Sequence, residues 1–393
     1  RIQNTKRLLD LLNMINALSN RSGYPCLSQN IYLNQASLGL LSDKTVTEMT
    51  KFLDTVARYG NLKMTDEEEA HFLNPLRRNV ATLLQAKQKN IAIVASASEI
   101  LSQIPELCKP KRNSKVILVS TDFPAITRPW LGSAKSRGFE ICFVHEIPEA
   151  DLTQSLIEKI DSNTSIVCVS YVQFASGTRI DVKELSQHTK KIGVKLVIDV
   201  TQAAGAIPIN INDWDLDILV CSGYKWLGGH GGIAIGWLSD EILDLEPPTI
   251  GWFGNENPFD MDATKLNLSK TAAKYTQSTL SYISVVGLNA AIEQLLEISI
   301  SEIMKHSDKL AMQLCSILLN SNWKAFRPAT SKEFSSHIIS LMHPSGDAIK
   351  STFEQLSENG LICGIRNGRL RVSISHYNNG NDIKYLGAAL HHE

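Results

Sequence analysis

Short, continuously apolar runs alternate with stretches of helical periodicity from about residue 90 onward. The runs lie at 91–94, 116–119, 141–144, 166–169, 196–198 and 218–220, and helical patterns lie between most of them, at 98–108, 127–137, 151–161 and 181–192. Unbroken rather than alternating hydrophobicity is typical of parallel strands that are buried on both faces. The alternation therefore predicts an α/β fold with a large, mainly parallel sheet and right-handed crossovers. Residues 232–237 follow so closely that we expect them to pair antiparallel.

The two ends of the chain carry a different pattern. Residues 1–20 have the periodicity of an amphipathic helix, and further helical patterns cover 43–60 and 66–87. Beyond about residue 280, a long helical region at 284–319 precedes strand-like pieces and two helices, at 336–342, 361–365, 369–375, 346–359 and 381–391. We therefore predict an N-terminal helix and arm over 1–30, a large domain over 31–283, and a small α+β domain over 284–393.

Composition narrows the class of protein. Hydrophobic residues make up 43% of the 393 residues and charged residues 20%, and the net charge of -1 gives no reason to expect nucleic acid or an anionic membrane as partner. No apolar stretch reaches about 18 residues, so no membrane span is expected. The seven cysteines are scattered without a CxxC pair, which favours reduced thiols in a cytoplasmic protein, and the histidines show no metal-ligand spacing.

A lysine stands at the exit of the last predicted parallel strand. The segment Cys221–Gly229 places Lys225 after an apolar run, in a Ser-Gly turn followed by glycines. Lysine is rarely fully buried, and an enclosed ammonium group is costly unless its pKa falls or it forms an imine. From this segment alone, a loop lysine and an imine-forming lysine are equally good interpretations.

Two further strand ends carry polar groups. Asp199 closes the run 196–198, where open α/β sheets bind ligands, although an aspartate there could also cap a helix. An amine and a carboxylate at one sheet edge suit a cofactor with an aldehyde and a pyridine nitrogen. The small residues of 94–98, between a strand and a helix, could cradle a phosphate or form a capping box.

Taken in order, these segments resemble the class V aminotransferase family of fold-type I pyridoxal 5'-phosphate (PLP) enzymes. That group includes cysteine desulfurases, isopenicillin N epimerase-like proteins, kynureninase and carbon–sulfur lyases. The resemblance runs from Tyr32–Ser37 to Leu370–Asn378. It implies PLP as cofactor, an amino acid as substrate, an N-terminal helix that packs on the small domain, and a homodimer with active sites at the interface.

The resemblance also implies roles for individual residues. Lys225 would form the imine, Asp199 would pair with the pyridine nitrogen, and Gln173 and Gln202 would lie near the ring hydroxyl. Phe123 falls where the family stacks an aromatic ring on the cofactor, although core packing would explain it equally well without the family.

The phosphate and the substrate complete this set. Ala97, Ser98, Ser222 and Tyr224 match phosphate-binding positions, and Thr279 matches a residue that reaches the phosphate of the partner subunit. The segment around Thr279 lacks the Glu and Gly of the family motif. The substrate would contact Ala36, Trp252 and Arg371, and the planar guanidinium of Arg371 suits an α-carboxylate.

One departure from the desulfurase pattern bears on the reaction. Desulfurases carry a nucleophilic cysteine on a loop before the carboxylate-binding arginine, whereas here Arg366–Arg371 leaves no room for such a loop, and Cys363 lies in an apolar run. We therefore expect external aldimine and quinonoid chemistry without a catalytic cysteine, in a lyase that removes a β-substituent. An amino-acid epimerase or aminotransferase is the alternative, and a PLP-binding protein without turnover is a third hypothesis.

Overall fold

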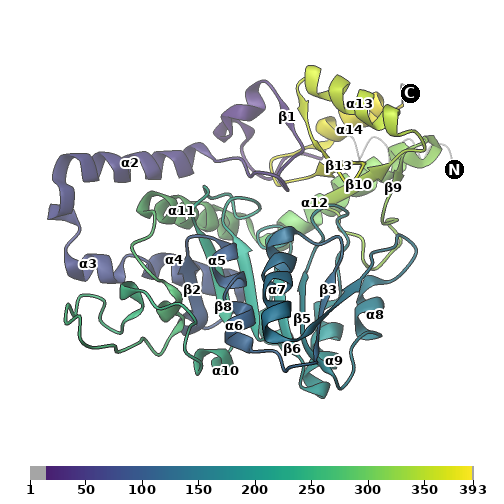
Figure 1. Ribbon diagram of the computed structural model, residues 1–393. Coiled ribbons are helices and arrows are strands. Elements are labelled where there is room, and N and C mark those ends of the chain that lie inside the picture. Colours follow the sequence, from purple (N-terminus) through teal and green to yellow (C-terminus); the bar gives the residue numbers. More distant parts are fainter. Residues whose placement is uncertain (1–14, 392–393) are drawn as a thin grey trace.

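The computed structural model describes residues 15–391 and contains a seven-stranded central sheet (Figure 1). The strands are β2 (Ile91–Val94), β3 (Lys115–Val119), β4 (Glu140–Val144), β5 (Thr164–Ser170), β6 (Lys195–Asp199), β7 (Ile218–Ser222) and β8 (Ala234–Leu238). Their order is β2-β8-β7-β6-β5-β3-β4, and β8 alone runs in the direction opposite to the other six strands. The predicted sheet, including the antiparallel run, is confirmed.

Helices cover both faces of this sheet, which explains the unbroken apolar runs. The covering helices include α5 (Ala97–Leu101), α6 (Ile104–Cys108), α7 (Pro124–Arg137), α8 (Leu152–Ile157) and α9 (Val182–Ile192). In β2, Ile91 and Ile93 belong to one hydrophobic cluster, whereas Ala92 and Val94 belong to the cluster on the opposite face. Successive side chains of a strand point to opposite faces, so a strand covered twice must be apolar throughout.

A second, smaller sheet lies above the first (Figure 1). It contains β9 (Lys324–Ala325), β10 (Ile338–Met342), β12 (Gly364–Arg366) and β13 (Arg369–Ser373), all antiparallel, in the order β12-β13-β10-β9. The helices around it are α12 (Ile300–Ile317), α13 (Gly346–Glu358) and α14 (Gly380–Leu390). This is the α+β arrangement that the sequence predicts for the C-terminal part.

Segments near both predicted domain boundaries pack in the core of the other domain. Strand β1 (Ile31–Tyr32) pairs in parallel with β11 (Leu361–Ile362), and Leu33 belongs to the core of the small sheet. Helix α11 (Tyr282–Ile298) packs instead against α2 (Asp43–Tyr59) and α4 (Asn74–Leu84), and it contributes to the core of the large sheet. The boundaries at 30 and 283 stay predictions.

Three predicted helices are shorter than their patterns. The pattern at 66–87 forms α3 (Asp66–His71) and α4, the pattern at 98–108 forms α5 and α6, and the pattern at 284–319 breaks at Ser299, whose φ is 77°. Pro75 and Pro105 stand in the first turns of α4 and α6, where proline is tolerated because its missing N–H would have no partner.

The prediction of a helix over 1–20 is wrong for residues 15–20. Residues 1–14 lie outside the described residues, whereas residues 15–20 are irregular and lie on the small domain. The N–H of Leu18 donates to the carbonyl of His376 at 2.8 Å, and the N–H of Gly380 donates to the carbonyl of Ile15 at 2.8 Å. These bonds to the small domain take the place of helical ones.

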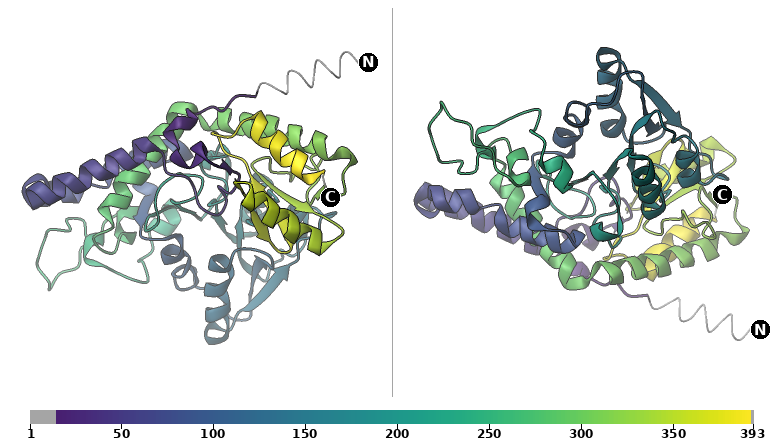
Figure 2. Two further views of the ribbon diagram at one scale, coloured as in Figure 1. Left: turned by 90° about the horizontal axis from the view of Figure 1, so that it is seen from above. Right: turned by 90° about the horizontal axis from the view of Figure 1, so that it is seen from below.

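Helix α2 packs against α11 and projects beyond the body of the molecule on one side, as the views from above and below show (Figure 2). Thr45 is its one buried residue. Over residues 15–391, no single helix is long and apolar enough to cross a membrane, and the bent pair Tyr282–Ile298 and Ile300–Asn320 passes that test by length and composition only.

Candidate active site

The candidate residues lie at the carboxyl ends of four strands, which together form the carboxyl edge of the large sheet. Strands β5, β6 and β7 are parallel, and β2 points the same way because it lies two antiparallel steps from β7. Asp199 and Ser222 are the last residues of β6 and β7, and Ala97 follows β2 closely. The small domain reaches this edge, since the ring of His337 hydrogen-bonds to the carbonyl of Gln202 at 2.6 Å.

Lys225 is enclosed at this edge, with 7% of its surface exposed. Its Nζ lies 5.2 Å from the ring centroid of Phe123 and 5.8 Å from that of Tyr224. Burial lowers the pKa of this amine to about 8, Asp199 acts in the opposite direction, and the positive charge of Arg371 lowers the pKa further. An amine of this kind is partly neutral near pH 8 and can act as a nucleophile or a base.

Asp199 is buried and held by its own turn. Its Oδ1 accepts the N–H of Thr201 at 2.6 Å, and the Oγ1 of Thr201 accepts the N–H of Ser222 at 3.0 Å. Burial raises the pKa of the Asp199 carboxyl, and the bonds from Thr201 and the charge of Lys225 oppose that rise. The carboxylate is therefore fixed beside the lysine in a site of low polarity.

Residues 35–39, the closing segment, lie against the turn that carries Lys225. Gln35 donates from Nε2 to the carbonyl of Lys225 at 2.9 Å, and Gly39 donates to the carbonyl of Tyr224 at 2.9 Å. A Cβ at Gly39 would lie 2.2 Å from the carbonyl oxygen of Lys225, so only glycine fits this approach. Ala36 is buried in the same segment and donates its N–H to the Oγ of Ser373 at 3.0 Å.

Arg371 enters the same space from the small domain. It is 1% exposed, and it donates to the carbonyl of Phe174 at 2.7 Å and to the Oγ of Ser37 at 2.5 Å. Its Nε is buried without a hydrogen-bond partner among the described residues. Burial lowers the pKa of Arg371 to about 10, and the neighbouring charge of Arg366 lowers it further. A buried guanidinium with an unused donor is suited to a carboxylate ligand.

Sequence reasoning missed that Arg366 accompanies Arg371. Its guanidinium also donates to the Oγ of Ser37, at 3.1 Å, so the two cations converge on one hydroxyl. The buried Oδ1 of Asn34 has no partner among the described residues. Arg366 stands on β12 and Arg371 on β13, so only the pairing of these strands brings the two together. The spacing of five residues gave no signal of it.

Phe123 and Gln173 lie beyond the ends of β3 and β5. The Phe123 ring is 41% exposed and contacts Phe174 edge-on at 5.4 Å, so it is a surface of the site rather than part of the core. Gln173 is buried, and its Oε1 has no partner in the described part of the chain. Both are bound to Asp122, whose pKa burial raises to about 6. The sequence gave no sign of this aspartate's part.

Gln202 differs from Gln173 because both ends of its amide are bound to protein. Its Nε2 donates to the carbonyl of Ala36 at 3.0 Å, and its Oε1 accepts the indole N–H of Trp226 at 2.8 Å. The structure therefore places Gln202 as a bridge between the closing segment and the strand exit.

The predicted phosphate residues share the edge with the lysine. Ala97 and Ser98 open α5, where the first amides have no intrahelical partner. Ser222 and Tyr224 come from the same turn as Lys225, and Tyr224 is half-buried. The order β2-β8-β7 sets α5 close to this turn.

Trp252 and Thr279 lie together, on the surface. The indole N–H of Trp252 donates to the Oγ of Ser278 at 3.3 Å, and its ring contacts Phe253 and Phe259. Both Trp252 and Thr279 are exposed in the single chain. The structure thus groups Trp252 with the Thr279 segment, while Arg371 and Ala36 lie with the closing segment.

A tight hairpin stands where a cysteine loop would have to be. Strands β12 and β13 are joined by Asn367 and Gly368, whose φ values of 49° and 70° are those of a two-residue turn. Cys363 is buried in the small core, and burial raises its pKa to about 12. The prediction that no loop fits here is confirmed, whereas Cys363 lies between β11 and β12 rather than in a strand.

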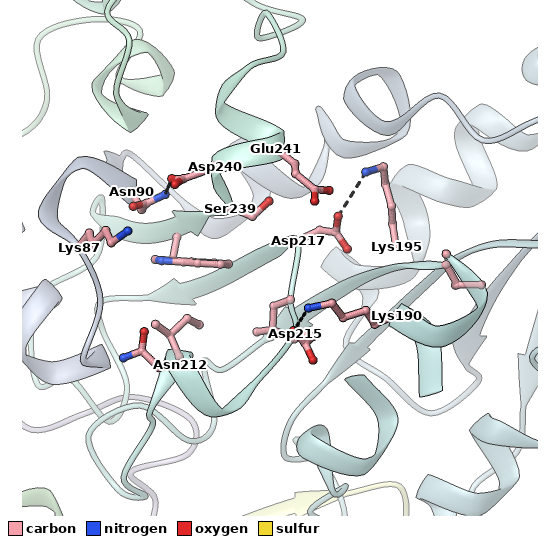
Figure 3. A pocket seen from close by; sticks show the side chains of 15 residues that line it. Lys87, Asn90, Lys190, Lys195, Asn212, Asp215, Asp217, Ser239, Asp240 and Glu241 are labelled. Carbon is pink, nitrogen blue, oxygen red and sulfur yellow. Dashed lines mark hydrogen bonds and ion pairs between the residues drawn. The ribbon is translucent and has the colours of Figure 1, made fainter. Parts of the chain in front are cut away.

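A cavity lies on the other side of the large sheet, away from Lys225 (Figure 3). Its volume is about 510 Å³, and it lies at the amino ends of β6 and β7. Four of its charged groups form two ion pairs: Lys195 with Asp217 at 3.2 Å, and Lys190 with Asp215. Among the described residues, no group of His, Cys, Asp and Glu could hold a metal ion.

The sequence profile of the family described as Aminotransferase class-V matches residues 31–386. This chain belongs to the class V aminotransferase family. It is 26% identical to an uncharacterised aminotransferase of Bacillus subtilis, over 73% of this chain and 75% of the relative. It is also 26% identical to the kynureninase of Debaryomyces hansenii, over 80% of this chain and 74% of that enzyme.

Solved structures show the same fold. A cystine C–S lyase in complex with cysteine persulfide superimposes with a TM-score of 0.84 at 17% identity, covering 93% of this chain and 98% of the lyase. The fold is therefore that of fold-type I PLP enzymes, as predicted. This member of the class V aminotransferase family is a PLP-dependent enzyme, and its cofactor is PLP.

The residues at the edge fit PLP. The amine of Lys225, the carboxylate of Asp199 and the unpartnered Oε1 of Gln173 offer complementary groups for an aldehyde, a ring nitrogen and a ring hydroxyl. The exposed Phe123 ring offers a stacking surface, and the opening amides of α5 offer donors for the phosphate.

Proposed function

We propose that this enzyme is a lyase that removes a β-substituent from an amino acid, acting on a cysteine-like substrate without a catalytic cysteine. The observation that carries the proposal is the hairpin that joins β12 to β13: it leaves Arg371 beside the lysine and leaves no loop for a thiol. Elimination requires a base and a carboxylate anchor but no thiol nucleophile.

The roles of the residues follow from their chemistry. Bound PLP supplies an electron sink for carbanion character at the substrate α-carbon. Lys225 would hold the cofactor covalently through its amine, and Asp199 would keep the ring nitrogen protonated. Arg371 would grip the α-carboxylate and orient the α-hydrogen, with Arg366 beside it.

Lys225 is also the candidate for proton transfer. Burial lowers the pKa of its amine to about 8, and this amine, when not bound to the cofactor, would accept the α-proton of the substrate. The same proton can then pass to the departing β-substituent. The Phe123 ring lies 5.2 Å from this amine and has no titratable group, so it cannot take part in proton transfer. We therefore assign both transfers to Lys225.

A panel of amino acids with three readouts tests the proposal. Release of pyruvate with sulfide or thiol from cysteine, cystine or a similar substrate is expected. Racemisation with deuterium exchange would identify an epimerase instead. Amine transfer to a keto acid would identify an aminotransferase, the alternative favoured by the B. subtilis relative. The Lys225→Ala variant is the control, and no turnover with any amino acid would favour a non-catalytic PLP protein.

We also propose a homodimer that covers α2 and the 250–266 loop. Leu53, Val56 and Tyr59 of α2 are exposed, and so are Met261 and Leu266 of the loop. Exposed large apolar side chains gathered on a helix and a loop suit an interaction surface, and a second copy seated there would also bring Trp252 and Thr279 into an interface.

Light scattering tests the dimer. The wild-type protein should have twice the chain mass of 43.5 kDa, and the double variant Met261→Asp, Leu266→Asp should be a monomer. Leu319→Asp, an equally exposed leucine of the small domain, is the matched control and should stay dimeric. A wild-type monomer at micromolar concentration would contradict the proposal.

A further inference from the structure

Asp122 joins two residues of the site through four accepted hydrogen bonds. Its Oδ1 accepts the N–H of Phe123 at 2.7 Å and the hydroxyl of Ser170 at 2.6 Å. Its Oδ2 accepts the N–H of Ser170 at 2.8 Å and the Nε2 of Gln173 at 3.3 Å. Asp122 is 6% exposed, and Ser170 pairs in register with Asp199 on the next strand. The carboxylate therefore ties Phe123 and Gln173 to the strand beside Asp199.

The acceptors around Gln173 decide which way its amide faces. Its Nε2 lies 3.3 Å from Oδ2 of Asp122 and 3.4 Å from the carbonyl oxygen of Ser170. A carboxylate and a carbonyl can only accept, so the NH₂ group must face them. The Oε1 then faces away from Asp122, and it is buried and without a partner in the described residues. A buried acceptor without a donor is costly, so a ligand hydroxyl that donates to this oxygen would be favoured.

Gln202 already uses its carbonyl oxygen and one amide N–H within the protein. Its Nε2 is bound to the carbonyl of Ala36 and its Oε1 to the indole of Trp226. Of the two glutamines that the family resemblance puts near the ring hydroxyl, Gln173 is the one whose buried side-chain oxygen has no partner in the described residues.

We propose that Asp122 is a positioning residue that turns the amide of Gln173 so that this side chain offers its acceptor, rather than its amide donor, to the ring hydroxyl of the cofactor. The inference rests on the proposed placement of Gln173 beside that hydroxyl. An acceptor there favours the protonated hydroxyl, whereas a donor would favour the phenolate. The bound cofactor should therefore keep its proton to higher pH than in a site with a donor.

The first test replaces the acceptor. The visible absorption band of the holoenzyme is titrated with pH, and Gln173→Leu, which is similar in size and has no acceptor, should lower the midpoint by about one pH unit. An unchanged or raised midpoint would overturn the inference.

The second test isolates Asp122. Asp122→Ser keeps an acceptor for the N–H of Phe123 but releases Gln173, whose amide can then turn and donate. Its midpoint should fall below that of Gln173→Leu, and the double variant Asp122→Ser, Gln173→Leu should return to the Gln173→Leu value. A midpoint of Asp122→Ser equal to that of the wild type, or a double variant below Gln173→Leu, would show that Asp122 does not act through Gln173.

The titration also separates this inference from the proposed function. A holoenzyme with a visible band whose midpoint ignores both substitutions overturns the positioning role alone. A protein with no such band after incubation with PLP overturns the cofactor site and the inference with it. If Asp122→Ser does not fold, as thermal unfolding of the apoenzyme would show, the Gln173→Leu midpoint still decides the sign.

Discussion

The side-chain nitrogen of Lys225 lies 5.2 Å from the centroid of the Phe123 ring. The two residues come from different strand exits, β7 and β3, so the fold brings the amine and the aromatic ring together from distant parts of the chain. Phe174 contacts the edge of Phe123, which holds the ring in this position although its face is exposed.

Loss of the Phe123 ring should weaken cofactor binding. Aromatic stacking contributes about 0.5–1.5 kcal/mol, so Phe123→Ala should raise the Kd for PLP roughly two- to tenfold. The measurement is a cofactor titration of the apoenzyme by absorbance. Leu131→Ala, an exposed position on α7, is the control and should bind PLP as the wild type does.

Removal of the Lys225 amine should abolish covalent attachment. Borohydride should add the mass of one reduced cofactor to the wild-type chain and nothing to Lys225→Ala, and the variant should lose turnover. Lys274→Ala is a useful comparison, because the Nζ of that buried lysine donates to the carbonyl of Leu245 at 2.8 Å and has no part in the site. If mass spectrometry finds the adduct on Lys225→Ala, the assignment is wrong.

The lowered pKa of Lys225 predicts a pH dependence of apoenzyme stability. Folding lowers this pKa from 10.5 to about 8, so between pH 8 and 10.5 the unfolded chain binds more protons than the folded one. Stability contributed by Lys225 should therefore rise with pH across that window, by up to about 3 kcal/mol, and be flat below pH 8. Urea unfolding of wild type and Lys225→Met from pH 7 to 11 measures the difference, and a constant difference would contradict the pKa.

Arg371 should act on substrates that carry an α-carboxylate. Arg371→Lys loses the planar fork and should lower kcat/KM roughly tenfold to a hundredfold. The amine analogue without the carboxylate should react equally slowly with both enzymes. Arg366→Lys should have a smaller effect, since Arg366 is the less buried of the two. Equal kcat/KM values for wild type and Arg371→Lys would exclude the carboxylate role.

Gly39 should be intolerant of any side chain. Gly39→Ala would place a Cβ 2.2 Å from the carbonyl oxygen of Lys225, so the closing segment must shift. We expect a loss of about 1–3 kcal/mol in the free energy of unfolding and faster release of the cofactor. Gly23→Ala is the control, because no atom lies within 4 Å of that Cβ position. Equal melting temperatures for the two variants would contradict the packing.

The sequence alone determined the architecture and the chemistry at single strand ends. The apolar runs predicted each strand of the large sheet because a strand covered on both faces cannot hide polar residues, and that constraint is local. Lys225, Asp199 and Arg371 were recognisable because each stands in a short pattern that the family shares. The short hairpin after Arg366 was predictable because too few residues separate Arg366 from Arg371 for a longer loop.

Only the tertiary structure decided which atoms are free. Arg366 joins Arg371 through strand pairing, and Asp122 reaches Gln173 across two strand exits, so no spacing along the chain reports either contact. The same holds for Gln202, whose amide is bound at both ends by residues 166 and 24 positions away. Hydrogen-bond partners depend on side chains meeting in space, and a side chain that suits a cofactor in the sequence can be bound by other parts of the protein once folded.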